Sequence, residues 1–418
     1  MKKIKILSLS DHPFSPSGVG TQTRYVLEAA IKTGLFEIRS LGGAIKHDNY
    51  SAITTDEYGD DWVVQPVDGY GNQSIIRSEI SNYRPDILWF MTDPRFYSWL
   101  WDIENEIRPN VPMIYYHVWD NIPYPNFNKL YYDSNDVIAT ISKVTDDVVR
   151  NVSPDADVRH MPHSIDTNIF KKYDDKEVAH FKENSVKKED MNKMIFFWNN
   201  RNARRKQSGS LIFWFKDFLD VVGHDKAMLI MHTDPKDPNG QDLTAIIEEL
   251  KLIDGQIIFS TDKYPQEVLA RIYNMVDCTI NISDAEGFGL STLESLACET
   301  PIIVNMTGGL QEQVTNGKKW FGIGLEPTSK AIIGSQEVPY IYEDRLSKEV
   351  VVDALLKMYN MTKEERDKLG RDGRAHVIKN YNFELFEKSW VDLLLQVYEN
   401  YGSWKTRKNY KPWKLQEV

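Results

Sequence analysis

Cysteine is scarce in this sequence and long apolar runs are absent, and both features narrow the class of protein. Only two cysteines occur among 418 residues, Cys278 and Cys298, each inside an apolar stretch and without the cysteine–histidine spacing of a metal site. Reduced, buried thiols are therefore expected. No run approaches the ~18 apolar residues of a membrane span, and the first apolar stretch is too short for a signal peptide. We therefore expect a soluble, cytoplasmic protein without stable membrane insertion.

The chain also has fewer positively charged than negatively charged residues. The chain has 50 Lys and Arg against 61 Asp and Glu, a net charge of −11, and the first 170 residues are acidic overall. A broad electrostatic attraction to nucleic acid or to anionic lipid is therefore not expected. The aromatic tail from Lys405 to Lys414 is a local basic exception.

Short apolar runs typical of buried strands alternate with amphipathic helical patterns along most of the chain. The strand candidates are Ile4–Ser10, Asp86–Met91, Pro112–His117, Asp136–Ser142, Met194–Asn199, Ala227–His232, Gln256–Thr261, Asp277–Ser283 and Pro301–Asn305. A charged stretch without a core pattern interrupts the alternation after Phe170. The pattern predicts an α/β fold with two Rossmann-like parallel-sheet domains facing a cleft. We place them at residues 1–170, joined by a C-terminal helix at about 383–418, and at residues 171–382.

A glycine-containing turn follows the strand candidate at 277–283. In "EGFGLSTLE", Gly287 and Gly289 permit close approach of the backbone to a ligand, and a helix is predicted to begin at about Ser291. Its first N–H groups suit a phosphate, and Glu286 and Glu294 suit the hydroxyls of a sugar or ribose. The alternative is structural: Ser291 and Glu294 have the spacing of a capping box, so Glu294 would only cap its own helix.

A basic loop follows the strand candidate at 194–199. "NRNARRK" contains four cations, Arg201, Arg204, Arg205 and Lys206. At the carboxyl end of a strand such a group can clamp a diphosphate, because arginine forms bidentate contacts and lysine adds a point charge. A solvated run of surface charge is the alternative interpretation.

These stretches resemble glycosyltransferase family 4 of the GT-B fold. "EGFGLSTLESLACETPIIVNMTGGLQEQV" is similar to the family's signature, in which seven residues separate two glutamates and a Gly-Gly pair follows. In the family's order, "SPSGVGTQTRYVLEAA" resembles the first glycine loop and helix, and "NRNARRK" resembles the basic donor-phosphate loop. The resemblance covers most of the chain and implies the GT-B architecture.

The resemblance also implies a substrate and a set of roles. A nucleoside-diphosphate sugar, of the UDP or GDP type, would bind mainly to the second domain. Glu286 would contact the hydroxyls of the donor sugar, Glu294 would bind the ribose, and Arg201 and Lys206 would hold the diphosphate. The remaining implied donor contacts are Gly18, Gly20, Gly287, Phe288, Gly289, Leu290 and Ser291.

Family members typically retain anomeric configuration and need no tightly bound metal or other cofactor. The resemblance therefore implies a retaining, metal-independent hexosyltransferase. Asp155 and Asp157 formally offer a metal-binding pair, but they lie in a polar turn. Without a metal, the cations and a helix N-terminus would stabilise the leaving diphosphate.

The strand candidate that ends at His117 adds two further candidates. His117 resembles the family's histidine near the donor sugar, and Asp120 in the following loop is a candidate base toward an acceptor hydroxyl. The alternative for His117 is a histidine that is merely hydrogen-bonded at a strand end. Thirteen aromatic residues lie between Trp89 and Tyr132; they form either a stacking platform or, as aromatic residues more often do, part of the core.

The leading functional hypothesis is transfer of a sugar to an acceptor hydroxyl. A glycan is the favoured acceptor, a membrane lipid is less favoured, and a modified DNA base rests only on the basic tail and the aromatic segment. A GT-B enzyme that acts on a nucleotide sugar without transfer, such as an epimerase, and an inactive sugar-nucleotide-binding module are the alternatives.

Overall fold

The computed structural model describes residues 2–412, which form two compact units. Unit 1 consists of residues 2–163, 334–339 and 384–412, and unit 2 consists of residues 164–333 and 340–383. Residues 164–170 thus belong to the second unit, although the sequence analysis assigned them to the first domain. Ser164 donates a hydrogen bond to the Tyr381 carbonyl at 2.7 Å, and Phe170 packs edge-on against Tyr273, so both are held by unit 2.

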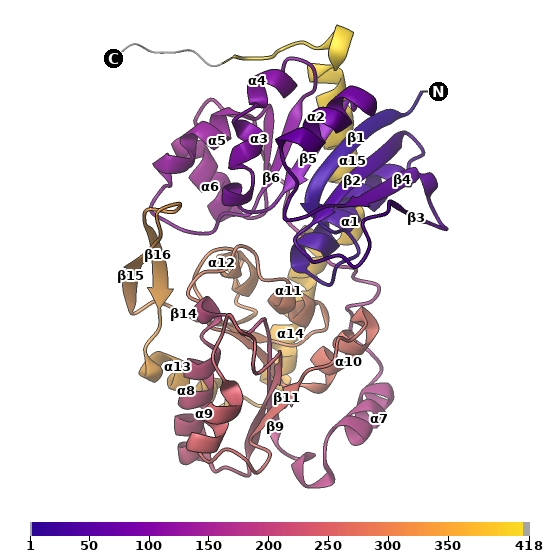
Figure 1. Cartoon of the computed structure of the whole chain (residues 1–418). Coiled ribbons are helices and arrows are strands. Elements are labelled where there is room, and N and C mark those ends of the chain that lie inside the picture. The colour runs from indigo at the N-terminus through magenta and orange to yellow at the C-terminus, as the bar shows by residue number, and fades with distance from the viewer. Residues whose placement is uncertain (1, 413–418) are drawn as a thin grey trace. The chain divides into compact units, whose positions relative to one another are not determined.

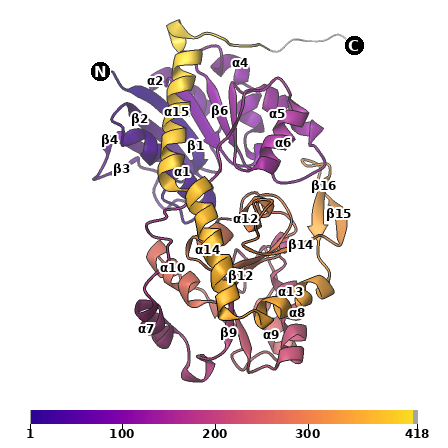
Figure 2. The ribbon, with the colours of Figure 1, turned by 180° about the vertical axis from the view of Figure 1, so that it is seen from behind.

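Unit 1 is built on an eight-stranded sheet in the order β3-β4-β2-β1-β5-β6-β7-β8, parallel except for β3 (Figure 1). Its strands are β1 Ile4–Asp11, β2 Phe36–Gly43, β3 Ile53–Thr55, β4 Gly59–Pro66, β5 Ile87–Met91, β6 Met113–His117, β7 Val137–Thr140 and β8 Val158–His160. Its helices are α1 Gly18–Ile31, α2 Gln73–Asn82, α3 Ser98–Trp101, α4 Glu104–Ile107, α5 Lys129–Asp133, α6 Lys143–Val152 and most of α15 Phe383–Tyr401. Figure 2 shows α15 lying along one face of the sheet, where Trp390 meets Trp89 and Tyr116.

Unit 2 contains a six-stranded parallel sheet in the order β11-β10-β9-β12-β13-β14 and a two-stranded antiparallel hairpin. The strands are β9 Met194–Asn199, β10 Ala227–His232, β11 Ile257–Ser260, β12 Cys278–Asn281, β13 Ile302–Asn305, β14 Gly322–Leu325, β15 Ser329–Ile333 and β16 Ile341–Arg345. The helices are α7 Asp175–Ser185, α8 Ser208–Val222, α9 Leu243–Glu249, α10 Gln266–Met275, α11 Leu290–Ala297, α12 Leu310–Val314, α13 Lys348–Asn360 and α14 Lys363–Asn380, with a 3₁₀ turn η4 at Arg204–Lys206.

The aromatic segment between residues 89 and 132 lies mainly in the core of unit 1. Trp89, Phe90, Tyr97, Tyr115 and Tyr132 are fully buried, and Phe90 stacks on Tyr115. The core interpretation of this segment is therefore confirmed for most of its residues. No helix within residues 2–412 has both the length and the apolar character needed to cross a membrane.

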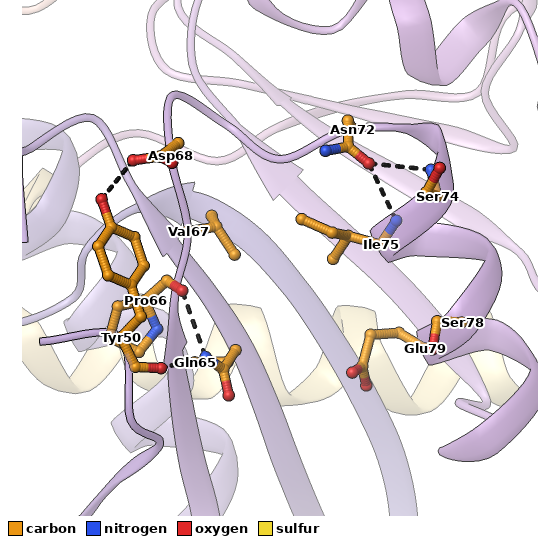
Figure 3. Close-up of a pocket in the computed structure, with 10 residues that line it drawn as sticks. All are labelled: Tyr50, Gln65, Pro66, Val67, Asp68, Asn72, Ser74, Ile75, Ser78 and Glu79. Carbon is orange, nitrogen blue, oxygen red and sulfur yellow. Dashed lines mark hydrogen bonds between the residues drawn. The ribbon is translucent and has the colours of Figure 1, made fainter.

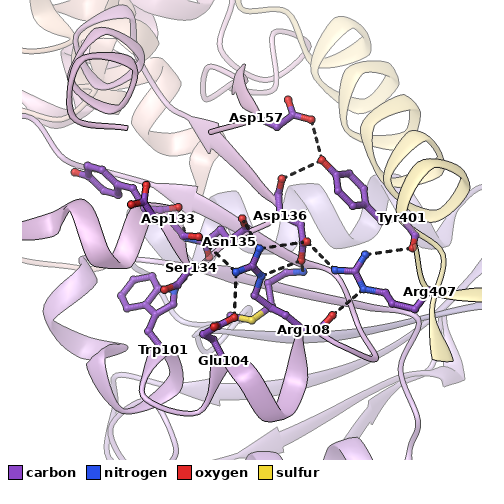
Figure 4. Close-up of polar contacts among 12 residues, drawn as sticks. Trp101, Glu104, Arg108, Asp133, Ser134, Asn135, Asp136, Asp157, Tyr401 and Arg407 are labelled. Atoms are coloured by element: carbon purple, nitrogen blue, oxygen red, sulfur yellow. Dashed lines mark hydrogen bonds and ion pairs between the residues drawn. The ribbon is translucent and has the colours of Figure 1, made fainter. Parts of the chain in front are cut away.

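The C-terminal tail packs on unit 1 in its described part, while Lys414 lies outside the described residues. The side chain of Arg407 is almost fully buried and pairs with Asp136 at 2.7 Å, next to Arg108, which also contacts this carboxylate (Figure 4). Tyr401 donates to Asp157 at 3.2 Å. One of the tail's positive charges is thus neutralised within unit 1, which weakens the tail as support for a nucleic-acid acceptor.

Candidate donor site in the second unit

The basic loop and the glutamate loop meet at one edge of the unit 2 sheet. β9 and β12 are adjacent and parallel, so the loops that follow them emerge side by side. Lys206 and Glu286 form a buried, short ion pair, and Arg205 Nη1 lies 3.9 Å from the other oxygen of Glu286. The two sequence motifs are therefore one cluster in space, as predicted.

Glu286 is ionised in this environment. Burial alone would raise its pKa, but the positive charges of Lys206 and Arg205, with hydrogen bonds from Lys206 and Asn281, lower it to about 2. Asn281 Nδ2 donates to Glu286 Oε2 at 3.3 Å, and the oxygen of the same amide accepts from Ser283. The carboxylate is thus fixed by Asn281 of β12 and by two cations of the loop that follows β9.

Glu294 has a different environment. It lies on α11, is partly buried, and accepts a 2.8 Å hydrogen bond from the hydroxyl of Tyr273 on α10. Asn199, the last residue of β9, donates to the same hydroxyl at 2.9 Å. Burial raises the pKa of Glu294 to about 7, and the bond from Tyr273 offsets only part of that increase. Near neutral pH the carboxyl of Glu294 is therefore partly protonated and partly ionised.

The structure contradicts the alternative in which Ser291 and Glu294 form a capping box. α11 begins at Leu290, one residue before the predicted start, and its N-cap is Gly289, which makes no side-chain cap. Gly289 has a φ of 89°, and a Cβ there would lie 2.6 Å from Leu310, so the turn requires glycine. With the helix started by a left-handed glycine, Ser291 lies inside the first turn and Glu294 is free of a capping role.

The turn before α11 is fixed by the loop that contains the Gly-Gly pair. Gly309 N–H donates to the carbonyl of Glu286 at 3.0 Å, and Gln313 donates to the carbonyl of Phe288 at 2.7 Å. A Cβ on Gly309 would lie 2.7 Å from the backbone of Gly287, which explains the glycine at this close approach. Phe288 itself is buried against Tyr381. Both its side chain and its carbonyl, which accepts from Gln313, are thus part of the scaffold of this turn.

The other cations of the basic loop pair with carboxylates that the sequence analysis did not single out. Arg201 is 65% exposed and forms a bidentate pair with Asp237, at 2.6 and 3.2 Å, and this partner lowers the pKa of Asp237 to about 2. Arg204 forms a bidentate pair with the buried Glu343 of β16. Both acids lie far away in sequence, in a turn and in a hairpin, and no local pattern marked them.

The glycine loop of unit 1 is held by its own polar side chains. Ser17 caps α1 by accepting from Gly20 N–H at 2.9 Å and donates to Asp11 at 2.6 Å. Gly20 is buried, and a Cβ there would lie 2.4 Å from the Ser15 hydroxyl, so its glycine serves the packing of the loop. Gly18 is exposed at the helix start.

His117 has a structural environment, which favours the alternative to the catalytic prediction. Its ring is fully buried and both nitrogens are hydrogen-bonded, to Tyr115 at 3.0 Å and to Tyr132 at 2.8 Å. Burial lowers the pKa of His117 to about 3, so the ring is neutral. The alternative interpretation, a hydrogen-bonded histidine at a strand end, describes this arrangement. Asp120 is only partly buried, in the loop after β6.

Within residues 2–412, no three His, Cys, Asp or Glu side chains converge in a way that suits a metal ion. Asp157, one of the two aspartates of the formal metal pair, instead accepts from Arg159 at 2.6 Å. Metal independence remains a prediction.

Comparison with known proteins supports a glycosyltransferase. A family model described as "Glycosyl transferases group 1" matches residues 181–376, most of unit 2. N-acetyl-alpha-D-glucosaminyl L-malate synthase of Bacillus anthracis is 22% identical over 237 residues, 56% of this chain and 58% of that protein. D-inositol 3-phosphate glycosyltransferase of Thermomonospora curvata is 39% identical over 70 residues, 16% of each chain. The chain therefore aligns with little more than half the length of the first relative.

Solved structures extend the likeness to almost the whole chain. Sucrose-phosphate synthase from Thermosynechococcus elongatus superposes with a TM-score of 0.75 and 16% identity, over 95% of this chain and 100% of that one. A trehalose-6-phosphate protein from E. coli, bound with UDP-2-fluoro glucose, gives a TM-score of 0.67 and 12% identity, over 94% and 99%. The chain thus has the GT-B fold, and its residues 181–376 carry the sequence pattern of the group 1 glycosyl transferases.

Proposed function

We propose that this protein is a retaining glycosyltransferase that moves a sugar from a nucleoside-diphosphate sugar to an acceptor hydroxyl without a metal ion. The observation that carries the proposal is the buried pair of Lys206 and ionised Glu286, which lies beside Arg205 at the carboxyl edge of the unit 2 sheet. Ligands bind at this edge in open α/β sheets.

The charges of this cluster suit the reaction. The bond between the anomeric carbon and the diphosphate oxygen breaks, the oxygen keeps the electron pair, and the ring becomes more positive. Lys206 has three N–H donors, so it can keep its contact with Glu286 and also donate to the departing phosphate. Glu286 accepts from hydroxyls of the transferred sugar. The uncapped start of α11 adds N–H groups and the positive end of its dipole for the leaving group.

Glu294 is proposed to bind the ribose of the donor. Its carboxyl is tied to Tyr273 through one oxygen, Oε2, and accepts a ribose hydroxyl through the other. Two solved proteins of the same fold support a uridine donor by their descriptions: one is in complex with UDP and glucose, and the other is bound with UDP-2-fluoro glucose. UDP is therefore the first nucleotide to test, with GDP second.

The acceptor is proposed to be a glycan hydroxyl. The new bond joins the acceptor oxygen to the anomeric carbon with the configuration retained, and the acceptor proton passes to a base, for which Asp120 is the candidate from unit 1. The names of two relatives, N-acetyl-alpha-D-glucosaminyl L-malate synthase and a probable sucrose-phosphate synthase, support a product that contains a transferred sugar.

A thermal-shift titration with UDP-glucose, UDP-N-acetylglucosamine and GDP-mannose tests the donor. A ligand at 100 times its Kd stabilises the folded state by about 2.7 kcal/mol, which raises the melting temperature by roughly 5–11 °C for a unit of this size. Glu286→Gln is expected to lower sugar transfer by roughly 10²-fold per folded enzyme. Glu248→Gln, an exposed exchange on α9, is the matched control. Absence of both a shift and donor hydrolysis with all three donors would refute the proposal.

A further inference from the structure

Unit 1 has a pocket that lies outside the proposed donor site. Its volume is ≈510 Å³, and it lies between α2 and the segment around the end of β4 (Figure 3). Pockets of about 300–1,000 Å³ hold small ligands. All ten lining residues belong to unit 1, and they lie between residues 50 and 79. Nothing in the proposed donor chemistry uses this pocket.

The lining combines apolar, aromatic and polar groups. Val67 and Ile75 supply apolar surface, and Figure 3 shows both side chains between the two walls. The Tyr50 ring forms part of one wall, because its hydroxyl donates to Asp68 and its carbonyl accepts from Gln65 at 2.7 Å. A fixed aromatic ring beside aliphatic surface offers flat apolar contact to one face of a small ring.

The polar groups are neutral donors or acceptors and two carboxylates. Ser74 and Ser78 present hydroxyls from α2. Glu79 uses Oε2 to bind Arg39 at 2.9 Å, which neutralises its charge. No lysine or arginine is among the lining residues, so the pocket has no charge partner for a phosphate or a carboxylate ligand. Many hydrogen-bonding groups without a cation select a neutral, hydroxyl-rich molecule.

The pocket also adjoins the edge of the sheet from which the glycine loop emerges. β1, β2 and β4 are parallel neighbours, so the chain leaves all three at the same edge. Directly after the lining residue Asp68, Gly69 accepts from Ala44 at 2.7 Å, and Tyr70 donates to Asp11 at 2.9 Å. The segment after β4 therefore connects the pocket to the residue that holds the α1 cap.

We propose that this pocket is a carbohydrate-binding site for a neutral saccharide unit of one or two rings. It is a binding site in unit 1, separate from the donor site, and it requires no catalytic step. A protein that elongates or decorates a glycan would gain from it a second contact with the chain of sugars. The inference itself rests on the lining residues and holds whether or not the donor site is active.

Saturation-transfer difference NMR on the full chain tests the proposal. The probes are methyl α-D-glucopyranoside, maltose, cellobiose and N,N′-diacetylchitobiose, with glucose 6-phosphate and glucosamine as charged comparators. Each spectrum is recorded without UDP and again with UDP at saturation, which occupies the proposed donor site. Ser78→Tyr and Ser74→Tyr each place a ring into the pocket, whereas Ser81→Tyr adds the same ring at an exposed position of α2 outside the lining. Thermal melts confirm that each variant is folded.

The expected result is an NMR saturation-transfer signal on at least one neutral probe with the wild type and with Ser81→Tyr. This signal should be lost in both pocket variants. Thermal shifts by UDP-glucose stay unchanged in all variants, which separates this site from the donor site. Three outcomes would overturn the proposal: no saturation-transfer signal on any neutral probe, a signal that survives in both pocket variants, or a signal that disappears when UDP is added. Equal transfer to a charged comparator would overturn the assignment to neutral saccharides.

Discussion

Exchange of Glu286 or Glu294 for glutamine is expected to change stability in opposite directions. Both exchanges keep the shape of the side chain and remove its ability to ionise. Glu286 lies beside two cations, whereas Glu294 contacts a tyrosine hydroxyl in a partly buried position. The charge of the first is therefore stabilised by the fold, and that of the second is penalised.

The magnitudes follow from the pKa values. Glu294 has a pKa of about 7 in the folded protein against an ordinary 4.5. Between pH 4.5 and pH 7 the folded state thus binds a proton that the unfolded state has lost. The stabilising effect of this proton is complete below pH 4.5 and is lost as the pH rises through 7. Glu286, with a pKa of about 2, behaves in the opposite sense. Its ionised carboxylate stabilises the fold fully above pH 4.5, and this stabilisation is lost as the pH falls through 2. Each difference corresponds to roughly 3 kcal/mol, an upper figure for the partly exposed Glu294.

Thermal unfolding at pH 5 and pH 8 measures the contrast. At pH 8, Glu294→Gln is expected to melt above the wild type by up to roughly 6–12 °C, and Glu286→Gln to melt below it by a similar amount. At pH 5 the advantage of Glu294→Gln largely disappears. Glu248→Gln controls for the loss of one surface charge. If Glu294→Gln melted below the wild type at pH 8, the bond from Tyr273 would outweigh burial, and the assigned cause of the raised pKa would be refuted.

Three further exchanges test the remaining parts of the structure. Lys206→Met leaves the buried Glu286 without its main counter-charge and is expected to cost about 3–5 kcal/mol; a double-mutant cycle in urea should show that adding Glu286→Gln recovers part of the loss. Gly289→Ala forces a Cβ toward Leu310 at a φ of 89°, so calorimetry should show a loss of about 1–3 kcal/mol together with weaker donor binding. His117→Gln should cost about 1–3 kcal/mol, because two tyrosine hydroxyls lose a partner, with transfer per folded molecule retained; a large loss of transfer at unchanged stability would support a catalytic role instead.

The two strands whose bounds were predicted without error are buried along almost their whole length. Met194–Asn199 and Ala227–His232 were predicted with the observed bounds, because unbroken apolar runs define central strands of a parallel sheet. β2 and β4 were missed, since "FEIRSLGG" and "GDDWVVQP" mix charged and apolar residues. Both lie toward one side of the unit 1 sheet. Buried and partly exposed side chains alternate in the first half of β2 and from Asp61 onward in β4, so their pattern is weaker than that of a central strand.

The candidate site was predicted where its residues lie in one loop and missed where they come from several elements. The spacing of the two glutamates and the basic loop were visible in the sequence. Tyr273 was not, because it is an ordinary helical aromatic residue until α10 packs beside α11 and brings its hydroxyl to Glu294. Glu343 became a partner of Arg204 only through the hairpin. Such pairings depend on tertiary structure and leave no local signal.

The two glutamates of one motif therefore have distinct charge states that the motif itself does not specify. The glycine turn and α11 set their positions, whereas the distant partners Lys206 and Tyr273 set their protonation. An ionised Glu286 only accepts hydrogen bonds, which suits the proposed contact with hydroxyls of a sugar whose ring becomes positive during the proposed transfer. A carboxyl with a pKa of about 7 can accept from a ribose hydroxyl when ionised and also donate when protonated. Donor affinity should consequently persist on both sides of pH 7, while its dependence on Glu286 extends over the whole neutral range.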